Sequence, residues 1–363
     1  MATMKDGQWW DKSWNPVVGC TKVSDGCRFC YAERMACRLA AIECANIGFV
    51  TSKTPKRQRR YIDVVKMWHD PKIEKTYFKG WNGKIFCDEK SLDFPLHWRK
   101  PRRIFVNSMS DTFHPKVPFE FILKLLAVIH LCPQHTFQIL TKRVDKMGAI
   151  FANIQAEDII HWARKIARGK GGKLMNDAAV VSWPLHNLWA GVTVCTPEEK
   201  PKIDILRQIP AAVRFISFEP LLADMGDIDL EGISWCIVGG ESGPNARPMH
   251  PDWVRGIRDQ CVAAGVPFFF KQWGEWMPFT ANVDNYYYGS TWGNKAYNRA
   301  LRRLAKAHGA SIVLDDRPKG WDNRMLKYGC AINKGLMIGR VTKKKAGCLL
   351  DGREWKEYPK ETK

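Results

Sequence analysis

Short apolar runs alternate with longer amphipathic stretches along most of the chain. Six of these runs are rich in β-branched and aromatic residues and have the length of buried strands. We predict strands over Arg103–Ser108, Thr136–Leu140, Leu188–Val194, Arg214–Phe218, Trp235–Val238 and Pro267–Lys271. Between them apolar residues recur at helical spacing, which predicts helices over Glu120–Leu131, Pro197–Gln208 and Asp252–Ala264. Strands that alternate with helices indicate βαβ units and a parallel sheet.

The number of strands and the residues at their ends favour a barrel. With Val17–Cys20 as a first strand, the count suits a partial or complete (β/α) barrel better than an open doubly wound sheet. Active sites of (β/α) barrels lie at the carboxyl ends of the strands, and nearly every predicted strand here ends in polar residues. These are Ser108, Ser110, Asp111 and His114; Thr141, Lys142 and Arg143; Thr193 and Thr196; Glu219; Gly239, Gly240, Glu241 and Ser242; and Gln272. For any single strand end, a solvated loop is the competing interpretation.

Two long segments interrupt the repeat. Residues 48–100 form an insertion with the basic run Lys53–Arg60, and residues 278–335 form another, in which Tyr286–Tyr288 and Trp292 lie among basic residues. Such mixtures are typical of surfaces that stack bases and hold phosphates, although solvated basic faces are also common. We therefore divide the chain into a core of residues 1–277, with its insertion at about 48–100, and a part of residues 278–363. The second part contains the other insertion and a C-terminal extension with a tight turn at Asp351–Gly352.

Composition narrows the partners. The 363 residues include 57 lysines and arginines against 37 acidic residues, a formal net charge of +20. That excess indicates a polyanion as substrate or partner. No stretch approaches the ~18 consecutive apolar residues of a membrane span, and no apolar run follows the charges near the N-terminus. We expect a cytoplasmic protein.

Twelve cysteines are many for a protein of a reducing compartment, where disulfides are unusual. We interpret Cys132, Cys195, Cys236 and Cys261 as small core residues, because their neighbours in sequence are apolar. In contrast, Cys20, Cys27 and Cys30 share one loop and can bind a metal together. Structural zinc needs a fourth ligand, for which Cys37 is the local candidate. However, Cys30, Cys37 and Cys44 recur every seven residues, which is typical of the packed face of a helix. Three cysteines without a fourth would leave one iron of a [4Fe–4S] cluster open to a small molecule.

A three-cysteine loop after the first predicted strand, with an aromatic residue directly after the last cysteine, resembles the radical S-adenosylmethionine (SAM) superfamily. Six residues separate Cys20 from Cys27, where the commonest form of that superfamily has three. The surrounding sequence resembles a bacteriophage-associated family of radical SAM-like proteins that carries the longer spacing. The segments that carry this resemblance are WNPVVGCTKVSDGCRFCYAERMA, IFVNSMSDTFH, FQILTKR, WAGVTVC, ISFEPLL, WCIVGGESGPNARPM, FFFKQWGEW and GCLLDGREWKEYP.

The resemblance implies a fold, two cofactors and a reaction. Cys20, Cys27 and Cys30 would hold a [4Fe–4S] cluster, and SAM would bind to its open iron, with Tyr31 against the adenine. Polar residues at the strand ends would hold the rest of SAM: Asn107, Ser108, Asp111, Lys142, Glu219, Gly239, Gly240 and Glu241. The protein would need an electron donor such as flavodoxin or ferredoxin, and if phage-encoded it would work in the host cytoplasm.

Some members of that family are linked to thymine hypermodification in viral DNA, a route to restriction evasion. They are thought to convert a glycine attached through its nitrogen into one attached through its α-carbon. The resemblance therefore implies a radical SAM isomerase acting on a modified thymine in DNA. The alternatives are a radical SAM lyase or methyltransferase on DNA or RNA, and a non-enzymatic zinc-stabilised nucleic-acid-binding protein.

Overall fold

The computed structural model describes residues 8–48, 54–73, 75–171, 180–280, 330–333, 336–340 and 343–360. Among these residues no helix is long and apolar enough to cross a membrane. The predicted stacking residues Tyr286–Tyr288 and Trp292 lie outside the described ranges, as does Lys53.

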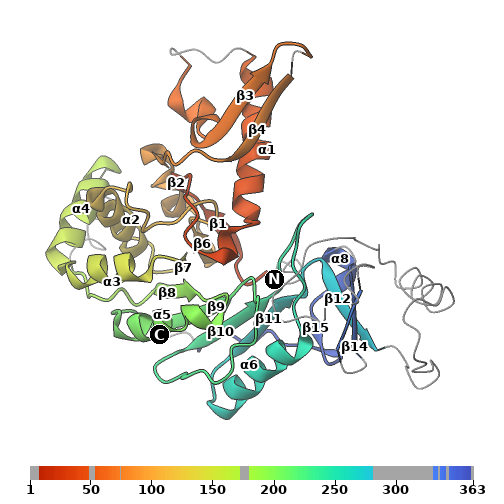
Figure 1. The fold of residues 1–363 in the computed structure, drawn as a ribbon. Coiled ribbons are helices and arrows are strands. Elements are labelled where there is room, and N and C mark those ends of the chain that lie inside the picture. Colours follow the sequence, from red (N-terminus) through yellow and green to blue (C-terminus); the bar gives the residue numbers. More distant parts are fainter. Residues whose placement is uncertain are drawn as a thin grey trace, which may run out of the picture.

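Seven parallel strands, in the order β1-β6-β7-β8-β9-β10-β11, form one sheet that curls into a half-barrel (Figure 1). Six of them match the predicted strands to within two residues, which confirms the α/β class and the partial barrel. The strands are β1 (Lys12–Trp14), β6 (Arg103–Val106), β7 (Thr136–Thr141), β8 (Leu188–Thr193), β9 (Val213–Phe218), β10 (Trp235–Gly239) and β11 (Phe268–Gln272).

The prediction for the first strand is wrong. Lys12–Trp14, not Val17–Cys20, pairs with β6. The segment Val17–Val18 (β2) instead pairs antiparallel with β5 (Phe86–Cys87). The error arose because Lys12–Trp14 has a single apolar residue, Trp14, whose burial comes from tertiary packing and not from a local pattern.

Helices cover the convex face of the sheet. Alternate strand residues such as Phe268 and Phe270 belong to the same buried cluster as the apolar sides of these helices. The helices are α2 (Phe119–His130), α3 (Val144–Ala152), α4 (Ala156–Gly169), α5 (Pro201–Gln208) and α6 (Pro251–Ala263). The predicted helix Pro197–Gln208 is divided into a 3-10 turn, η6 (Pro197–Glu199), and α5. Proline lacks the N–H that would continue the first turn but fits the first position of a new helix, and α5 begins at Pro201.

Aromatic side chains fill the lower part of the concave face. Phe105, Trp189, Phe215, Trp235 and Phe269 form a buried cluster there. The segment before β1 adds Trp9, and the C-terminal tail adds Tyr358, whose ring lies 5.3 Å from that of Trp235. The tail also pairs with the edge strand β11, since Phe270 N donates to Trp355 O at 2.8 Å. Apart from buried Gln138, the cross-strand partner of Phe105, the polar groups on the concave face gather at the carboxyl ends of the strands.

A long helix and a β-ribbon stand away from the half-barrel (Figure 1). The helix is α1 (Tyr31–Ile47), which precedes the predicted first insertion. The ribbon is the antiparallel pair β3 (Val65–Asp70) and β4 (Lys75–Trp81), and both strands lie within that insertion. Shorter turns in this region are η2 (Lys56–Arg59), η3 (Ile62–Val64), η4 (Glu89–Ser91) and η5 (Phe94–His97).

Small antiparallel ladders follow β11. One sheet has the order β12-β14-β13, and a hairpin joins β15 to β16. The predicted turn at Asp351–Gly352 is confirmed, with φ of 51° and 80° at its two residues. The bounds are β12 (Trp276–Thr280), β13 (Cys330–Asn333), β14 (Leu336–Arg340), α8 (Lys343–Ala346), β15 (Leu349–Leu350) and β16 (Arg353–Glu354).

Candidate functional site

A loop with three free thiols lies at the carboxyl ends of the strands. Cys20, Cys27 and Cys30 are half-buried, and none of them forms a disulfide. Cys27 closes a 3-10 turn, η1 (Asp25–Cys27), and Cys30 is the N-cap residue of α1. The loop starts at Gly19, where φ is 98° and a Cβ would come 2.4 Å from Lys84 O. Only glycine fits this position, so the backbone direction into the loop is fixed.

A buried ion pair from two strand ends holds the first cysteine. Arg143, just after β7, lies 2.8 Å from Asp111, which follows β6, and both side chains are less than a tenth exposed. The same guanidinium donates to Thr21 O at 2.8 Å and reaches Cys20 Sγ at 3.7 Å. Asp111 also accepts a hydrogen bond from Thr141 Oγ1 at 2.8 Å. The predicted site residue Asp111 therefore acts through Arg143, a role that the sequence did not suggest.

A fourth cysteine lies directly against the loop. Cys195, two residues after β8, is completely buried, and a Cβ at Gly26 would come 2.3 Å from its Sγ. The same Cβ would lie 3.4 Å from Lys142 Cε, so the lysine and Cys195 enclose the turn that carries Cys27. Its apolar neighbours in sequence indicate only a small core residue. Its place at a strand end was the signal that could have singled it out.

The electrostatics of these thiols follow from burial and two cations. Burial raises the pKa of Cys20 to about 11, with Asp111 adding to the rise and Arg143 opposing it. Burial likewise raises the pKa of Cys195 to about 12, against the effect of Lys142. Burial also opposes the charge of Lys142, but nearby thiols more than offset this, and the pKa of the lysine is raised. Burial therefore favours the protonated form of Cys20 and Cys195, and the two nearby cations, Arg143 and Lys142, oppose this only in part.

A second group of polar residues lies at the ends of β9 and β11. Glu219 pairs with Lys271 at 2.8 Å, and it accepts hydrogen bonds from Ser217 Oγ at 3.1 Å and Trp9 Nε1 at 3.3 Å. A Cβ at Gly239 would come 2.7 Å from Glu219 Oε1. The resemblance assigns Gly239 to the binding of SAM. In the structure, the space that its missing side chain leaves is filled by the carboxylate of Glu219. Lys271 is a further site residue that the sequence analysis missed.

The loop after β10 reaches across to the cysteine loop. Glu241 is 6% exposed and pairs with Arg247 at 2.7 Å, and Arg247 in turn binds both the carboxylate and the carbonyl of Asp25. Gly240 is needed because a Cβ would come 2.0 Å from the carbonyl oxygen of Trp273. Glu241 therefore connects to the cysteine loop through Arg247, a residue that the sequence did not indicate, and Gly240 allows the loop after β10 to pack against Trp273.

The remaining predicted site residues lie near Tyr31, at the start of α1. Its hydroxyl donates to Ser108 O at 2.8 Å, while the residue as a whole stays 49% exposed. The Ser108 hydroxyl donates to Asn15 Oδ1 at 3.1 Å. Asn107 is buried, and its amide accepts from Val17 N at 3.0 Å and donates to Thr112 Oγ1 at 2.8 Å. Its side chain thus ties β2 to the end of β6, whereas Tyr31 as a whole stays half exposed.

The zinc alternative needs Cys37 as a fourth ligand beside the loop. Cys37 packs against the same apolar cluster beside α1 as Cys20 and Cys30, but its Sγ accepts a hydrogen bond from Gly80 N of the β-ribbon at 3.2 Å. In the part of the chain that the structure describes, no three histidine, cysteine or acidic side chains converge where one metal ion could be held.

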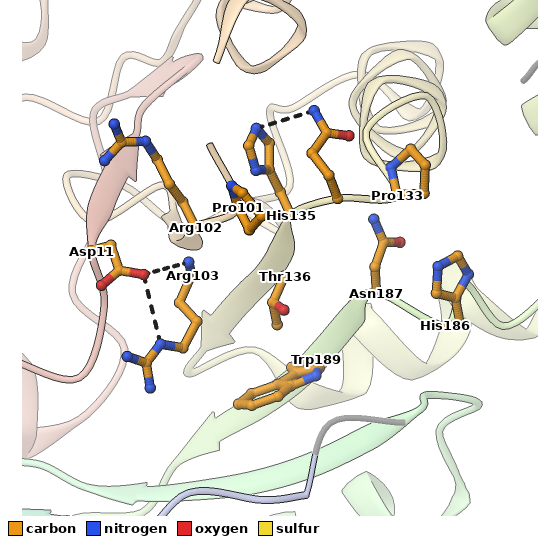
Figure 2. A pocket seen from close by; sticks show the side chains of 11 residues that line it. Asp11, Pro101, Arg102, Arg103, Pro133, His135, Thr136, His186, Asn187 and Trp189 are labelled. Carbon is orange, nitrogen blue, oxygen red and sulfur yellow. Dashed lines mark hydrogen bonds and ion pairs between the residues drawn. The ribbon is translucent and has the colours of Figure 1, made fainter. Parts of the chain in front are cut away.

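A separate polar cavity lies at the opposite end of the sheet. It has a volume of about 440 Å³ and is lined at the amino ends of β6, β7 and β8 by residues that include Arg102, Arg103, His135 and Asn187 (Figure 2). Figure 2 shows Asp11 beside Arg103, whose backbone N–H donates to it at 2.7 Å. In (β/α) folds this end of the sheet serves stability, and the carboxyl ends carry the chemistry.

Together, the fold and the site define a class: α/β half-barrel proteins with a three-cysteine loop over the carboxyl ends of a parallel sheet. The chain belongs to the family DUF5131, described as a protein of unknown function, whose model matches residues 5–359. Comparisons with curated proteins and with solved structures gave no match.

Proposed function

We propose that this protein is a radical SAM enzyme that acts on a modified thymine in DNA. Specifically, it would isomerise 5-N-α-glycinylthymidine to 5-C-α-glycinylthymidine, the reaction implied by the resemblance to the phage-associated family. The observation that carries the proposal is the set of three free thiols on one loop, beside Arg143 and Lys142, at the end of the sheet where such folds place their chemistry. The net charge of +20 supports a nucleic-acid substrate.

In this proposal each group of site residues has its own role. Cys20, Cys27 and Cys30 hold the cluster, and Arg143 and Lys142 offset the negative charge of the thiolates. When bound together, a reduced [4Fe–4S] cluster and SAM supply a 5′-deoxyadenosyl radical that abstracts hydrogen from an unactivated C–H bond. Tyr31, half exposed as a whole, offers a stacking face next to Cys30. Glu219 and Lys271 offer one charge of each sign for the amine and carboxylate of an amino acid. The aromatic residues below close the floor of the site against water.

Cys30 and Cys37, about two turns apart on α1, give a matched test. Anaerobically reconstituted wild-type protein should be brown with about four irons, and when reduced with SAM it should release 5′-deoxyadenosine. Cys30→Ala should lose both iron and SAM cleavage. Cys37→Ala should keep both, because the Cys37 thiol contacts Gly80 of the β-ribbon. Equal loss of iron in the two variants would refute the three-ligand assignment, and a colourless zinc protein would support the binding-module alternative.

The reaction itself is tested by mass. DNA that carries the N-linked glycine should yield a nucleoside of unchanged mass with a new chromatographic position and fragmentation pattern. A gain of a methyl group or a loss of carbon dioxide would refute the isomerase and favour the methyltransferase or lyase alternative.

A further inference from the structure

The ribbon of β3 and β4 has one face that packs in part on α1 and one face that points away from it. Side chains alternate across a strand, so Phe78 and Gly80 share one face of β4 while Tyr77 and Lys79 share the other. Phe78 packs in the cluster beside α1, and Gly80 N donates to Cys37 Sγ on that helix. The second face, with Tyr77 and Lys79, therefore points away from the helix. We call it the outer face of the ribbon.

An exposed aromatic pair lies on this outer face. Trp68 is the cross-strand partner of Tyr77, and the two rings are stacked at 5.2 Å with an interplanar angle of 13°. Tyr77 also has Lys75 Nζ 5.3 Å from its ring centre. Trp68 is 48% exposed. A large indole this exposed, held flat by a ring beneath it, is a rigid platform for stacking, and burying it would be favourable.

The charges around the pair are positive. Between residues 54 and 84 the sequence has nine basic residues and three acidic ones. Lys75 and Lys79 lie on the outer face itself, two residues to either side of Tyr77, and both are exposed. Two arginines of the run Lys53–Arg60 form ion pairs within the protein and so are less available to a polyanion than the sequence indicates. Arg59 pairs with Asp63 at 3.0 Å, and Arg60 pairs with buried Asp88 at 3.2 Å.

The ribbon begins beside the cysteine loop. Trp81 N, at the end of β4, donates to Glu33 Oε1 at 3.1 Å, and Glu33 follows Cys30 by three residues. Tyr77 lies four residues further out, about 13 Å along the strand. The aromatic pair and the thiols are therefore within one turn of duplex DNA, about 34 Å, of each other.

We propose that the outer face of the ribbon binds DNA, with Trp68 stacking on a base and Lys75 and Lys79 contacting phosphates. A two-stranded ribbon fits the major groove, and aromatic wedges and platforms favour unstacked bases. An enzyme that acts on a base must take it out of the stack, and an arm beside the site would hold the DNA while this happens. The choice of DNA among polyanions rests on the proposed function.

The test measures binding of the full-length protein to a fluorescein-labelled duplex of about 20 base pairs, two helical turns, by anisotropy over a range of salt. Trp68→Ala should weaken binding roughly 5- to 100-fold, and Trp68→Phe should restore much of it. Met67→Ala is the matched control, because Met67 is 50% exposed on the same strand but on the opposite face. Lys75→Gln and Lys79→Gln should each make the slope of log K against log salt less negative by about 0.9.

Several outcomes would overturn the inference. Wild-type affinity in Trp68→Ala would do so while the proposed function stands, and so would an equal loss in Met67→Ala. An equal loss of heparin binding in Trp68→Ala would reduce the face to a general polyanion surface and overturn the stacking role. If the wild-type protein binds no duplex even at low salt, both the inference and the DNA substrate of the proposed function fail.

Discussion

The contact between Gly26 and Cys195 gives a sharp test of how the cysteine loop is held. The perturbation is Gly26→Ala. Its new methyl carbon would lie 2.3 Å from Cys195 Sγ, whereas non-bonded carbon contacts have an optimum of about 3.5–4.0 Å. The loop or Cys195 must therefore move by more than about 1 Å. Overpacking of this kind costs about 1–3 kcal/mol, and the displaced turn carries Cys27.

Removing the sulfur should relieve the clash. Cys195→Ala alone costs on the order of 1 kcal/mol, because one buried heavy atom is lost. In the double variant Gly26→Ala/Cys195→Ala, the closest remaining atoms are the Cβ of residue 195 at 3.3 Å and Lys142 Cε at 3.4 Å. Both contacts are tight but need a shift of only a few tenths of an ångström. We therefore expect the double variant to be more stable than the sum of the single changes by about 1–2 kcal/mol.

The assays are urea unfolding of the four proteins without metal and iron content after reconstitution. Gly26→Ala should lose stability and iron, and the double variant should recover much of both. Gly256→Ala is the control, because a Cβ there meets nothing within 4 Å and a helical glycine replaced by alanine should stabilise by about 0.5–1 kcal/mol. Strictly additive effects, or unchanged stability and iron in Gly26→Ala, would show that Cys195 does not support the loop.

Two further predictions concern buried polar groups. Arg143→Gln leaves the buried carboxylate of Asp111 without its ion pair. The free energy of unfolding, measured by thermal unfolding, should therefore fall by about 3–5 kcal/mol. Asp111→Asn added to Arg143→Gln should recover part of it, and a full loss in both would argue against the ion pair as the cause. Burial lowers the pKa of His135, so the unfolded chain binds a proton that the folded protein resists, and stability should be complete above about pH 6.5 and fall as the pH drops below it. His135→Gln should flatten that part of the stability curve between pH 7 and 5, and an unchanged slope would assign the acid sensitivity to other groups.

The sheet could be predicted because its strands are buried on both faces. Such strands are continuous apolar runs, and that pattern is local, as in Leu188–Thr193 and Trp235–Gly239. Lys12–Trp14 lacked it, since its burial depends on Trp14 packing against residues far away in sequence. The division of Pro197–Gln208 follows from a single proline, Pro201, which the periodicity of the segment did not take into account.

The sequence predicted which polar residues lie at the strand ends, but not which of them contact each other. Strand ends meet at one edge of a parallel sheet, so polar residues there could be assigned to one site from sequence. Which of them contact each other depends on side-chain direction across distant segments. Asn107 forms internal hydrogen bonds and Glu241 forms an internal ion pair. Cys195 contacts Gly26, although Gly26 precedes it by 169 positions in the chain. No local pattern encodes such contacts.

The way in which the cysteine loop is supported bears on what it does. Small zinc-dependent modules fold only when the metal binds, because little else orders their ligands. Here β7 holds the loop through Arg143, β8 through Cys195 and β10 through Arg247, and two of these contacts are buried. We therefore expect the loop to be ordered before metal binds, in a position relative to Tyr31 and Glu219 that the sheet sets. A preformed loop of thiols above an aromatic floor favours a site that handles a bound ligand over one that only stabilises the fold.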